Sequence, residues 1–534
     1  MSAHDPPVGG RGSDGRADPG TPPLDVMLEE IDLAVEPVTG SASFAPSAGI
    51  AVAGGSMLPL PKEVGDPEPA RTESFRSGFT QAGPVAIAGL IVNGASAVIV
   101  VIVAHLVSPR AYGAIAQLLG LFFILSMPGS AVLVGVVRRV TALRAGGRPE
   151  LVHRWASKVH RILLGVIAVE LVVVWLLQGW IARQLSLPND DGVVLILVAA
   201  GVWILLCVDR GLLQAHRDYR SLAINLLVEG TMRTVCVIGF VVAGWGVSGY
   251  ALGIFLSEVV ATVHARWLAS RAWPAQPAPS VEGGADGGAA DATPAGHGPA
   301  TRTPGAGTEV ARRALVADVA AAFCGLALLG LLQNVDVILL GRLDHAQAGA
   351  YAAISVASKG LVFGALALGA YLLPEATIRW NEGGHAVRQL AVTLALLAVP
   401  AVVLLAVALW VPVWFLSLIF TPKLATAAPA FASLVGAMVF LCISVLLTNY
   451  LFGAGRRWIV LLLAGGSVLA VVLLSAAGGR PVATARADLL VQALLAVAMG
   501  TAFLVIHQRH HGELLRRNEQ FRGIVGRFRR SDPA

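Results

Sequence analysis

Twelve apolar segments, arranged as two groups of six, dominate the hydrophobic pattern of this chain. Most are about 20 residues long, which is the length a helix needs to cross the hydrocarbon core of a bilayer. The strands of a membrane barrel would give shorter, alternating segments, so helices are the expected spanning form. The expected spans are residues 83–106, 114–137, 162–182, 193–213, 222–244, 248–268, 316–340, 349–373, 388–412, 429–451, 458–477 and 487–506.

This pattern predicts an all-α polytopic membrane protein with about 12 transmembrane helices in two six-helix lobes. Each group contains an even number of crossings, so the two lobes would run in the same direction. That arrangement suggests a parallel repeat about an axis normal to the membrane. A short sequence echo supports it: "HLVSPRAYGAIAQL" after the first span resembles "GRLDHAQAGAYAAIS" after the seventh, and pairs Gly113 with Gly349.

Polar stretches divide the chain into five expected regions. Gly-, Pro- and Ala-rich sequence before the first span and between the two groups is typical of disordered tails and linkers. The regions are a disordered N-terminal tail (1–75), a first lobe (80–270), a flexible linker (271–313), a second lobe (314–508) and a basic C-terminal tail (509–534).

The distribution of charge predicts the orientation. The net charge of +6 could indicate nucleic-acid binding, but only 13% of residues are charged and 56% are hydrophobic. With the N-terminus in the cytoplasm, twenty-six Lys and Arg residues fall on the cytoplasmic side of the spans and six on the outer side. The positive-inside rule therefore favours a multi-pass protein of the cytoplasmic membrane with both termini inside, and the basic charge does not indicate a nucleic-acid partner.

Charged residues within the spans are costly in lipid and are candidate functional groups. Glu229 and Arg233 are four residues apart on one helical face, so they form either a structural ion pair or a site where Arg233 binds an anionic ligand. Lys359 has no carboxylate nearby on its own helix, which favours a partner on another helix or a position facing a cavity. Glu258 could carry a proton or pair with one of these bases, whereas Asp336 is expected near the outer end of its span, where water could hydrate it.

Uncharged polar residues in the spans are more often interhelical hydrogen-bonding groups than ligands. Asn93 is nevertheless a candidate substrate contact. Glu170 stands alone in a Val- and Leu-rich segment and could be protonated and silent. The other uncharged polar residues within the spans are Gln117, Asn449 and Gln492.

The sequence lacks common enzyme and metal-binding motifs. The sequence contains no phosphate-binding P-loop, no GxSxG and no HExxH pattern, and the spacing of its four cysteines does not match a zinc site. The sequence therefore predicts a protein that is not an enzyme and has no cofactor or metal.

The loops between the spans resemble those of a known family. "LVSPRAYGAIAQLLGLFFIL" resembles the hairpin between the first two helices of polysaccharide flippases, and "DRGLLQAHRDYRSLAINLLVEGTMR" resembles their turn after the fourth helix. "NVDVILLGRLDHAQAGAYAA" resembles the end of their seventh helix, and "LGAYLLPEATI" and "YLFGAGRRW" resemble the ends of helices eight and ten. The matching residues are Leu106, Pro109, Tyr112, Gly113, Arg210, Gly211, Gln214, Arg217, Tyr219, Arg233, Asp336, Gly341, Gly349, Tyr351 and Pro374.

The resemblance covers about residues 80–506 and points to the multidrug/oligosaccharidyl-lipid/polysaccharide (MOP) exporter superfamily, in its O-antigen and teichoic-acid branch. It implies a V-shaped, MATE-like pair of lobes that works by alternating access on a polyprenyl-diphosphate-linked oligosaccharide. Arg233, Lys359 and Asn93 are then candidate substrate contacts. Glu229, Glu258 and Asp336 are candidates for coupling to H⁺ or Na⁺.

Three further expectations follow from the resemblance. The N-terminal tail, through "LDVMLEEIDLAVEPV", could contact glycan-assembly proteins, although chance amphipathicity also explains that segment. A drug exporter of the same superfamily, or a major-facilitator protein, is the main alternative function. A glycan polymerase or ligase is a weaker alternative because the expected outer loops are short.

Overall fold

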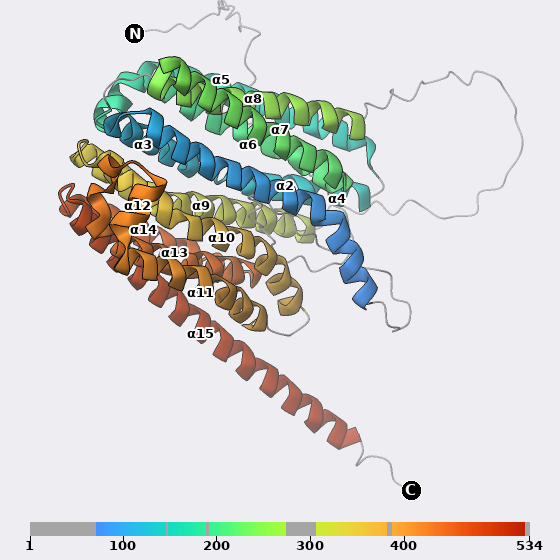
Figure 1. Ribbon diagram of the computed structural model, residues 1–534. Helices are drawn as coiled ribbons and strands as arrows, with labels where there is room; N and C mark the ends of the chain where they lie inside the picture. The colour runs from blue at the N-terminus through green and yellow to red at the C-terminus, as the bar shows by residue number, and fades with distance from the viewer. Residues whose placement is uncertain (1–70, 146–147, 188–191, 274–305, 382–386, 529–534) are drawn as a thin grey trace, which may run out of the picture.

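The computed structural model describes residues 71–145, 148–187, 192–273, 306–381 and 387–528, and these residues form helices without any strand (Figure 1). The α-helices of the first half are α2 (Arg71–Leu106), α3 (Pro109–Ser126), α4 (Gly129–Ala145), α5 (Glu150–Gln184), α6 (Val193–His216), α7 (Tyr219–Phe240) and α8 (Gly246–Ala272). Those of the second half are α9 (Ala306–Leu343), α10 (Ala348–Asn381), α11 (Val387–Trp410), α12 (Pro412–Ile419), α13 (Ala428–Gly453), α14 (Ile459–Ala476) and α15 (Pro481–Phe528).

Eleven continuous segments of the described chain are long and apolar enough to cross a membrane. One of them, Tyr219–Ala272, is 54 residues long and contains two crossings. A π-helical turn, Val241–Trp245, joins α7 to α8, and positive φ angles of 89° at Gly244 and 52° at Gly246 reverse the chain there. Since α7 and α8 pack against each other as a hairpin, the twelve expected crossings are present in this multi-pass membrane protein.

The second crossing is broken in two, which the sequence analysis did not predict. Helix α3 starts with Ser108, whose side chain accepts a 3.3 Å hydrogen bond from the Ala111 amide, followed by Pro109 at the first helical position. It ends at Ser126, and α4 starts at Gly129. Pro128 lies between them and has no amide hydrogen to continue the helical ladder, so the expected continuous span 114–137 divides at this residue.

The helices of the two halves pair in the same way. In the first half α2 packs on α7, α4 and α3 on α6, α5 on α6, and α8 on both α6 and α7. In the second half the equivalent partners are α9 with α14, α10 with α13, α11 with α13, and α15 with both α13 and α14. This shared pattern supports the parallel internal repeat that the sequence echoes suggested.

The connections after odd-numbered crossings, including residues 107–108 and 343–348, lie at one end of the bundle, which we call the first-loop end. The other end, where α8 stops and α9 starts, is called the linker end (Figure 1). The two halves contact each other mainly through α3 and α4 of the first half and α9 and α10 of the second. One buried apolar core extends through both halves.

Outside that core, several helices present apolar side chains outward. Helix α5 exposes Val169, Trp175 and Leu176, and α11 exposes Val399 and Trp410. Such faces suit lipid, which does not need polar atoms on the surface it covers.

The expected tails and linker do not coincide with the ends of the helices. Helix α2 begins within the expected 1–75 tail, α9 within the expected linker, and α15 continues to Phe528 through much of the expected C-terminal tail. The segment "LDVMLEEIDLAVEPV" lies outside the described residues.

Candidate functional site

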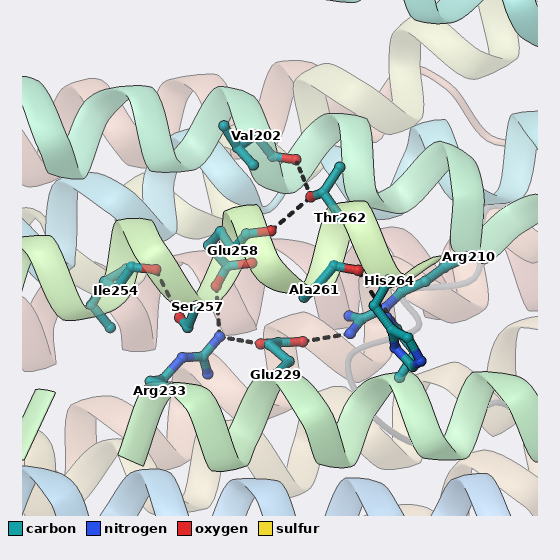
Figure 2. A network of polar contacts seen from close by, with 11 residues as sticks. Val202, Arg210, Glu229, Arg233, Ile254, Ser257, Glu258, Ala261, Thr262 and His264 are labelled. Atoms are coloured by element: carbon teal, nitrogen blue, oxygen red, sulfur yellow. Dashed lines mark hydrogen bonds and ion pairs between the residues drawn. The ribbon is translucent and has the colours of Figure 1, made fainter. Parts of the chain in front are cut away.

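A chain of charged side chains joins three helices in the first half. We call Arg210 on α6, Glu229 and Arg233 on α7, and Glu258 on α8 the first-half cluster (Figure 2). The Glu229 carboxylate is 2% exposed and accepts from both arginines, one on each oxygen. Arg210 Nη2 is 2.5 Å from Glu229 Oε2, and Arg233 Nη2 also donates to Glu258 Oε1 at 2.7 Å.

Neighbouring groups fix the geometry of this cluster. Arg210 Nε donates to Asn225 Oδ1 at 2.8 Å, and Asn225 Nδ2 in turn donates to the Ala261 carbonyl at 2.9 Å. The Arg210 guanidinium also lies 5.4 Å from the Trp203 ring centroid. With both carboxyls ionised, two positive and two negative charges balance, so the cluster tolerates a low dielectric.

A second ion pair extends from the same turn of α6 towards the linker end. Asp209 is fully buried, with Oδ2 at 3.0 Å from His160 Nε2 on α5 and Oδ1 at 3.5 Å from Arg266 Nη1 on α8. His160 Nδ1 lies 2.7 Å from the Ala156 carbonyl oxygen, which can only accept a hydrogen bond. The two polar networks together tie α5, α7 and α8 to α6.

The second half contains a smaller polar cluster with an unequal number of charges. We call Asp336 on α9, Lys359 on α10 and Asp488 on α15 the second-half cluster. Lys359 Nζ is 3.6 Å from Asp336 Oδ1 and 3.2 Å from Asn334 Oδ1. Asp336 and Asp488 are both 0% exposed and close enough to interact electrostatically.

Several polar atoms in and beside the second-half cluster lack a hydrogen-bond partner among the described residues. They include Asp488 Oδ2 and Gln492 Oε1. Gln492 Nε2 does have partners, the Leu332 carbonyl oxygen and Asp488 Oδ1, both at 3.1 Å. With both carboxyls ionised the cluster has one negative charge more than it has positive charges, and both carboxyls are fully buried.

Comparison with solved structures gives the fold. No family model and no curated protein sequence matches this chain. The structure superposes on a multidrug-resistance MATE transporter of the MOP superfamily in an inward-facing conformation, with a TM-score of 0.57, 14% identity, and coverage of 78% of this chain and 94% of the other. It superposes on a point mutant of the Vibrio cholerae MATE transporter VcmN with a TM-score of 0.53, 15% identity, and coverage of 81% and 96%. The chain has the MATE fold.

Within the MATE fold, three of the sequence-predicted residues come together in the first half and two in the second half. The expected i,i+4 ion pair of Glu229 and Arg233 is present, and Glu258 joins it. Lys359 finds its partner on another helix, as its isolation on α10 required. Asn93 is exposed on α2 and belongs to neither cluster.

The expected environment of Asp336 was wrong. The side chain is fully buried, and it accepts from Ser355 Oγ at 3.4 Å and pairs with Lys359. Position along a span gives depth only approximately, and here α10 and α15 cover the residue from the sides. The interhelical hydrogen bond expected of Gln492 is present, whereas the Asn449 amide donates to the Val445 carbonyl of its own helix.

Sequence reasoning missed four residues that organise the MATE fold in this chain. Arg210 was assigned to a cytoplasmic loop, although it and Asp209 are two adjacent charges inside the apolar segment "LLCVDRGLL". That adjacency was the available signal. Asp488 lies inside the expected span 487–506 but was not named as a candidate. Its spacing of four from Gln492 could have indicated a shared face, while Asn225 gave no signal of its own.

Proposed function

We propose that this chain is a transporter of the MOP superfamily, in the polysaccharide flippase branch, which works by alternating access. One observation carries the proposal: residues of the loop resemblance occupy the contacts that organise the fold. Gly113 and Gly349 lie where α3 meets α10, Arg210 anchors the first-half cluster, and Asp336 anchors the second.

The proposed substrate is a polyprenyl-diphosphate-linked oligosaccharide. Its diphosphate and sugars would lose their hydration in the bilayer core, and that cost is prohibitive for unassisted crossing. A hydrated path between the two lobes removes the penalty while the polyprenyl chain stays in lipid. Arg233 and Lys359 are the proposed counter-charges, with side chains that are 16% and 10% exposed.

Both bases are already paired with carboxylates, so anion binding requires an exchange of partners. For Arg233 this exchange is feasible because Glu229 keeps its second partner, Arg210, when Arg233 turns away. Lys359 is held by a longer contact, 3.6 Å, and Asp336 also accepts from Ser355. The diphosphate would thus replace a carboxylate in each cluster, and the released carboxylate would become available to a cation.

The second-half cluster is the proposed site of coupling to H⁺ or Na⁺. Its surplus of one carboxylate is neutralised when a proton or a metal cation binds, and Asp488 Oδ2 is an acceptor without a partner among the described residues. Lys359 would link this event to substrate, because it interacts with both carboxyls. Glu258, whose Oε2 has no hydrogen-bond partner in the part of the chain that the structure describes, is the corresponding candidate in the first half.

The proposed orientation places the linker end in the cytoplasm. Bases at the helix ends and loops there outnumber those at the first-loop end, where Arg110, Arg183, Arg342, Lys423, Arg480 and Arg486 lie. Substrate would then enter from the cytoplasmic leaflet, and an N-terminal tail on that side could contact glycan-assembly proteins.

The decisive experiment is deletion of the gene followed by analysis of lipid-linked glycans. We expect the polyprenyl-diphosphate oligosaccharide to accumulate in the cytoplasmic leaflet, and wild-type protein to restore its export. Arg233→Gln and Lys359→Gln should reach the membrane in normal amounts without restoring export. Normal export by both variants would contradict the proposed substrate site.

Export of drugs or other small molecules is the alternative, and it is favoured by the likeness to a multidrug-resistance MATE transporter. The same deletion strain separates the two functions. If the protein is a drug exporter, its deletion would leave lipid-linked glycans unchanged and increase sensitivity to toxic small molecules, and Asp336→Asn would reproduce that sensitivity.

A further inference from the structure

The two halves touch at a pair of glycines that the internal repeat makes equivalent. Gly113 lies in the first turns of α3 and Gly349 in the first turn of α10, so each follows a short connection at the first-loop end. The sequence echo pairs these two residues with each other. Residues related by a two-fold operation can touch only near its axis, so this contact lies on the axis of the repeat.

Backbone meets backbone at this point. A Cβ atom added to Gly113 would lie 2.7 Å from Ala348 Cβ and 2.8 Å from the Gly349 amide nitrogen. One added to Gly349 would overlap the Pro109 carbonyl oxygen and lie 2.8 Å from the Pro109 carbonyl carbon. Neither helix can yield by turning a side chain, so any residue larger than glycine must separate the helices.

Other contacts close the same end around this pair. Arg110 Nη2 is 3.2 Å from His345 Nε2, and Ser186 Oγ donates to the Arg342 carbonyl at 3.0 Å. Each of these two contacts joins residues close to helix ends in opposite halves. Deeper in the bundle, Gly341 receives the side chain of Gln117, and Phe123 packs edge-on against Phe363 with centroids 6.1 Å apart.

We propose that Gly113 and Gly349 determine how stably the first-loop end closes, and that a single methyl group at either position favours the conformation in which this end is open. The effect is steric and lies on the axis about which the halves would move apart. It concerns the opening and closing of the protein and holds for either substrate class under the proposed function.

Alanine normally stabilises a helix relative to glycine, so local propensity predicts the opposite result. Two other helical glycines provide matched controls. Gly94 in α2 and Gly360 in α10 have no atom within 4 Å of an added Cβ. Ala at either control position tests helix propensity without the inter-half contact.

Cross-linking across the first-loop end measures closure. The full chain would carry Arg110→Cys and His345→Cys, with the four native cysteines replaced by alanine, in membranes treated with a short bismaleimide. We expect Gly113→Ala and Gly349→Ala each to reduce the cross-linked fraction by about fivefold or more, and Gly94→Ala and Gly360→Ala to leave it unchanged.

Undiminished cross-linking in both interface variants would overturn the proposal. So would failure to recover either variant as a monodisperse protein when the controls are recovered, because the contact would then be required for folding and not for closing. The assay needs no substrate, so its result is independent of whether lipid-linked glycans or drugs are transported.

Discussion

Arg210 on α6 and Glu229 on α7 form a buried ion pair at 2.5 Å, and their side chains are 5% and 3% exposed. The pair joins two helices that the sequence separates only by the turn around Arg217 and Asp218. Because Glu229 also binds Arg233, the carboxylate has two counter-charges, and the two arginines are not equivalent. Arg210 joins α6 to α7, whereas Arg233 joins α7 to α8 through Glu258.

Replacing Arg210 should therefore be more damaging than replacing Arg266, the arginine that pairs with Asp209. Arg210→Gln loses the Glu229 contact and leaves the carboxylate dependent on one partner, and breaking a buried pair from one side costs about 3–5 kcal/mol. We expect a large fall in the thermal unfolding temperature of the detergent-purified protein. Arg266→Gln is the matched control, because its side chain is 37% exposed and its contact with Asp209 is 3.5 Å. Equal falls in unfolding temperature for Arg210→Gln and Arg266→Gln would contradict the stabilising role assigned to the Arg210–Glu229 pair.

A double-mutant cycle should reveal the coupling of Arg233 to Glu258. In Arg233→Gln the Glu258 carboxyl loses its partner, so Glu258→Gln should partly restore stability in that background while destabilising the wild type. We expect an interaction energy of about 0.5–3 kcal/mol, the range for residues that share one network. Additive effects in thermal unfolding would show that the two side chains act independently.

Asp488→Asn should stabilise the folded protein while removing its response to the coupling ion. The substitution removes the surplus negative charge and keeps a hydrogen-bonding group next to Gln492, so less uncompensated charge is buried. Transport in proteoliposomes should then no longer change with an imposed H⁺ or Na⁺ gradient.

Lys359→Gln provides the opposite test. Asp336 and Asp488 would remain without the lysine that offsets their charge, and the protein should unfold at a lower temperature than the wild type. A gradient response that survives in Asp488→Asn would place coupling elsewhere, with Glu258 as the next candidate.

Arg217→Gly should raise stability. Arg217 ends α6 with φ of 62°, a left-handed conformation that costs a residue with a Cβ atom about 1–2 kcal/mol. Glycine removes this conformational cost. Arg217→Ala removes most of the side chain but retains the cost, because alanine still has a Cβ atom. A higher unfolding temperature for the glycine variant than for the alanine variant would confirm that backbone conformation is the cause.

The sequence predicted the number of crossings and the shared direction of the two halves because lipid imposes strong rules on segment length and charge. The equivalence of Gly113 and Gly349 was also visible in the loops. The contact between them was not, since alignment of a repeat does not show where its axis passes. The break at Pro128 could have been predicted from the proline alone.

The polar clusters were predicted only in part. Glu229 and Arg233 lie on the same helix, so their spacing identified the pair. Lys359 has no carboxylate nearby on its own helix, which indicated a partner on another helix. Arg210, Asp209 and Asp488 meet partners on other helices, and their importance depends on how α5–α9 and α15 pack. Asp336 is buried despite its expected place near the end of a span, because α10 and α15 cover its side chain.

The shared helix pairing of the two halves does not extend to their charges. The first half balances its arginines and glutamates, while the second contains two aspartates and a single lysine. The two halves share an architecture but differ in charge. The cluster of the first half is neutral, whereas the net charge of the second-half cluster depends on whether a proton or a cation is bound. This difference would let the first lobe keep its structure while the second lobe changes its conformation when a cation binds.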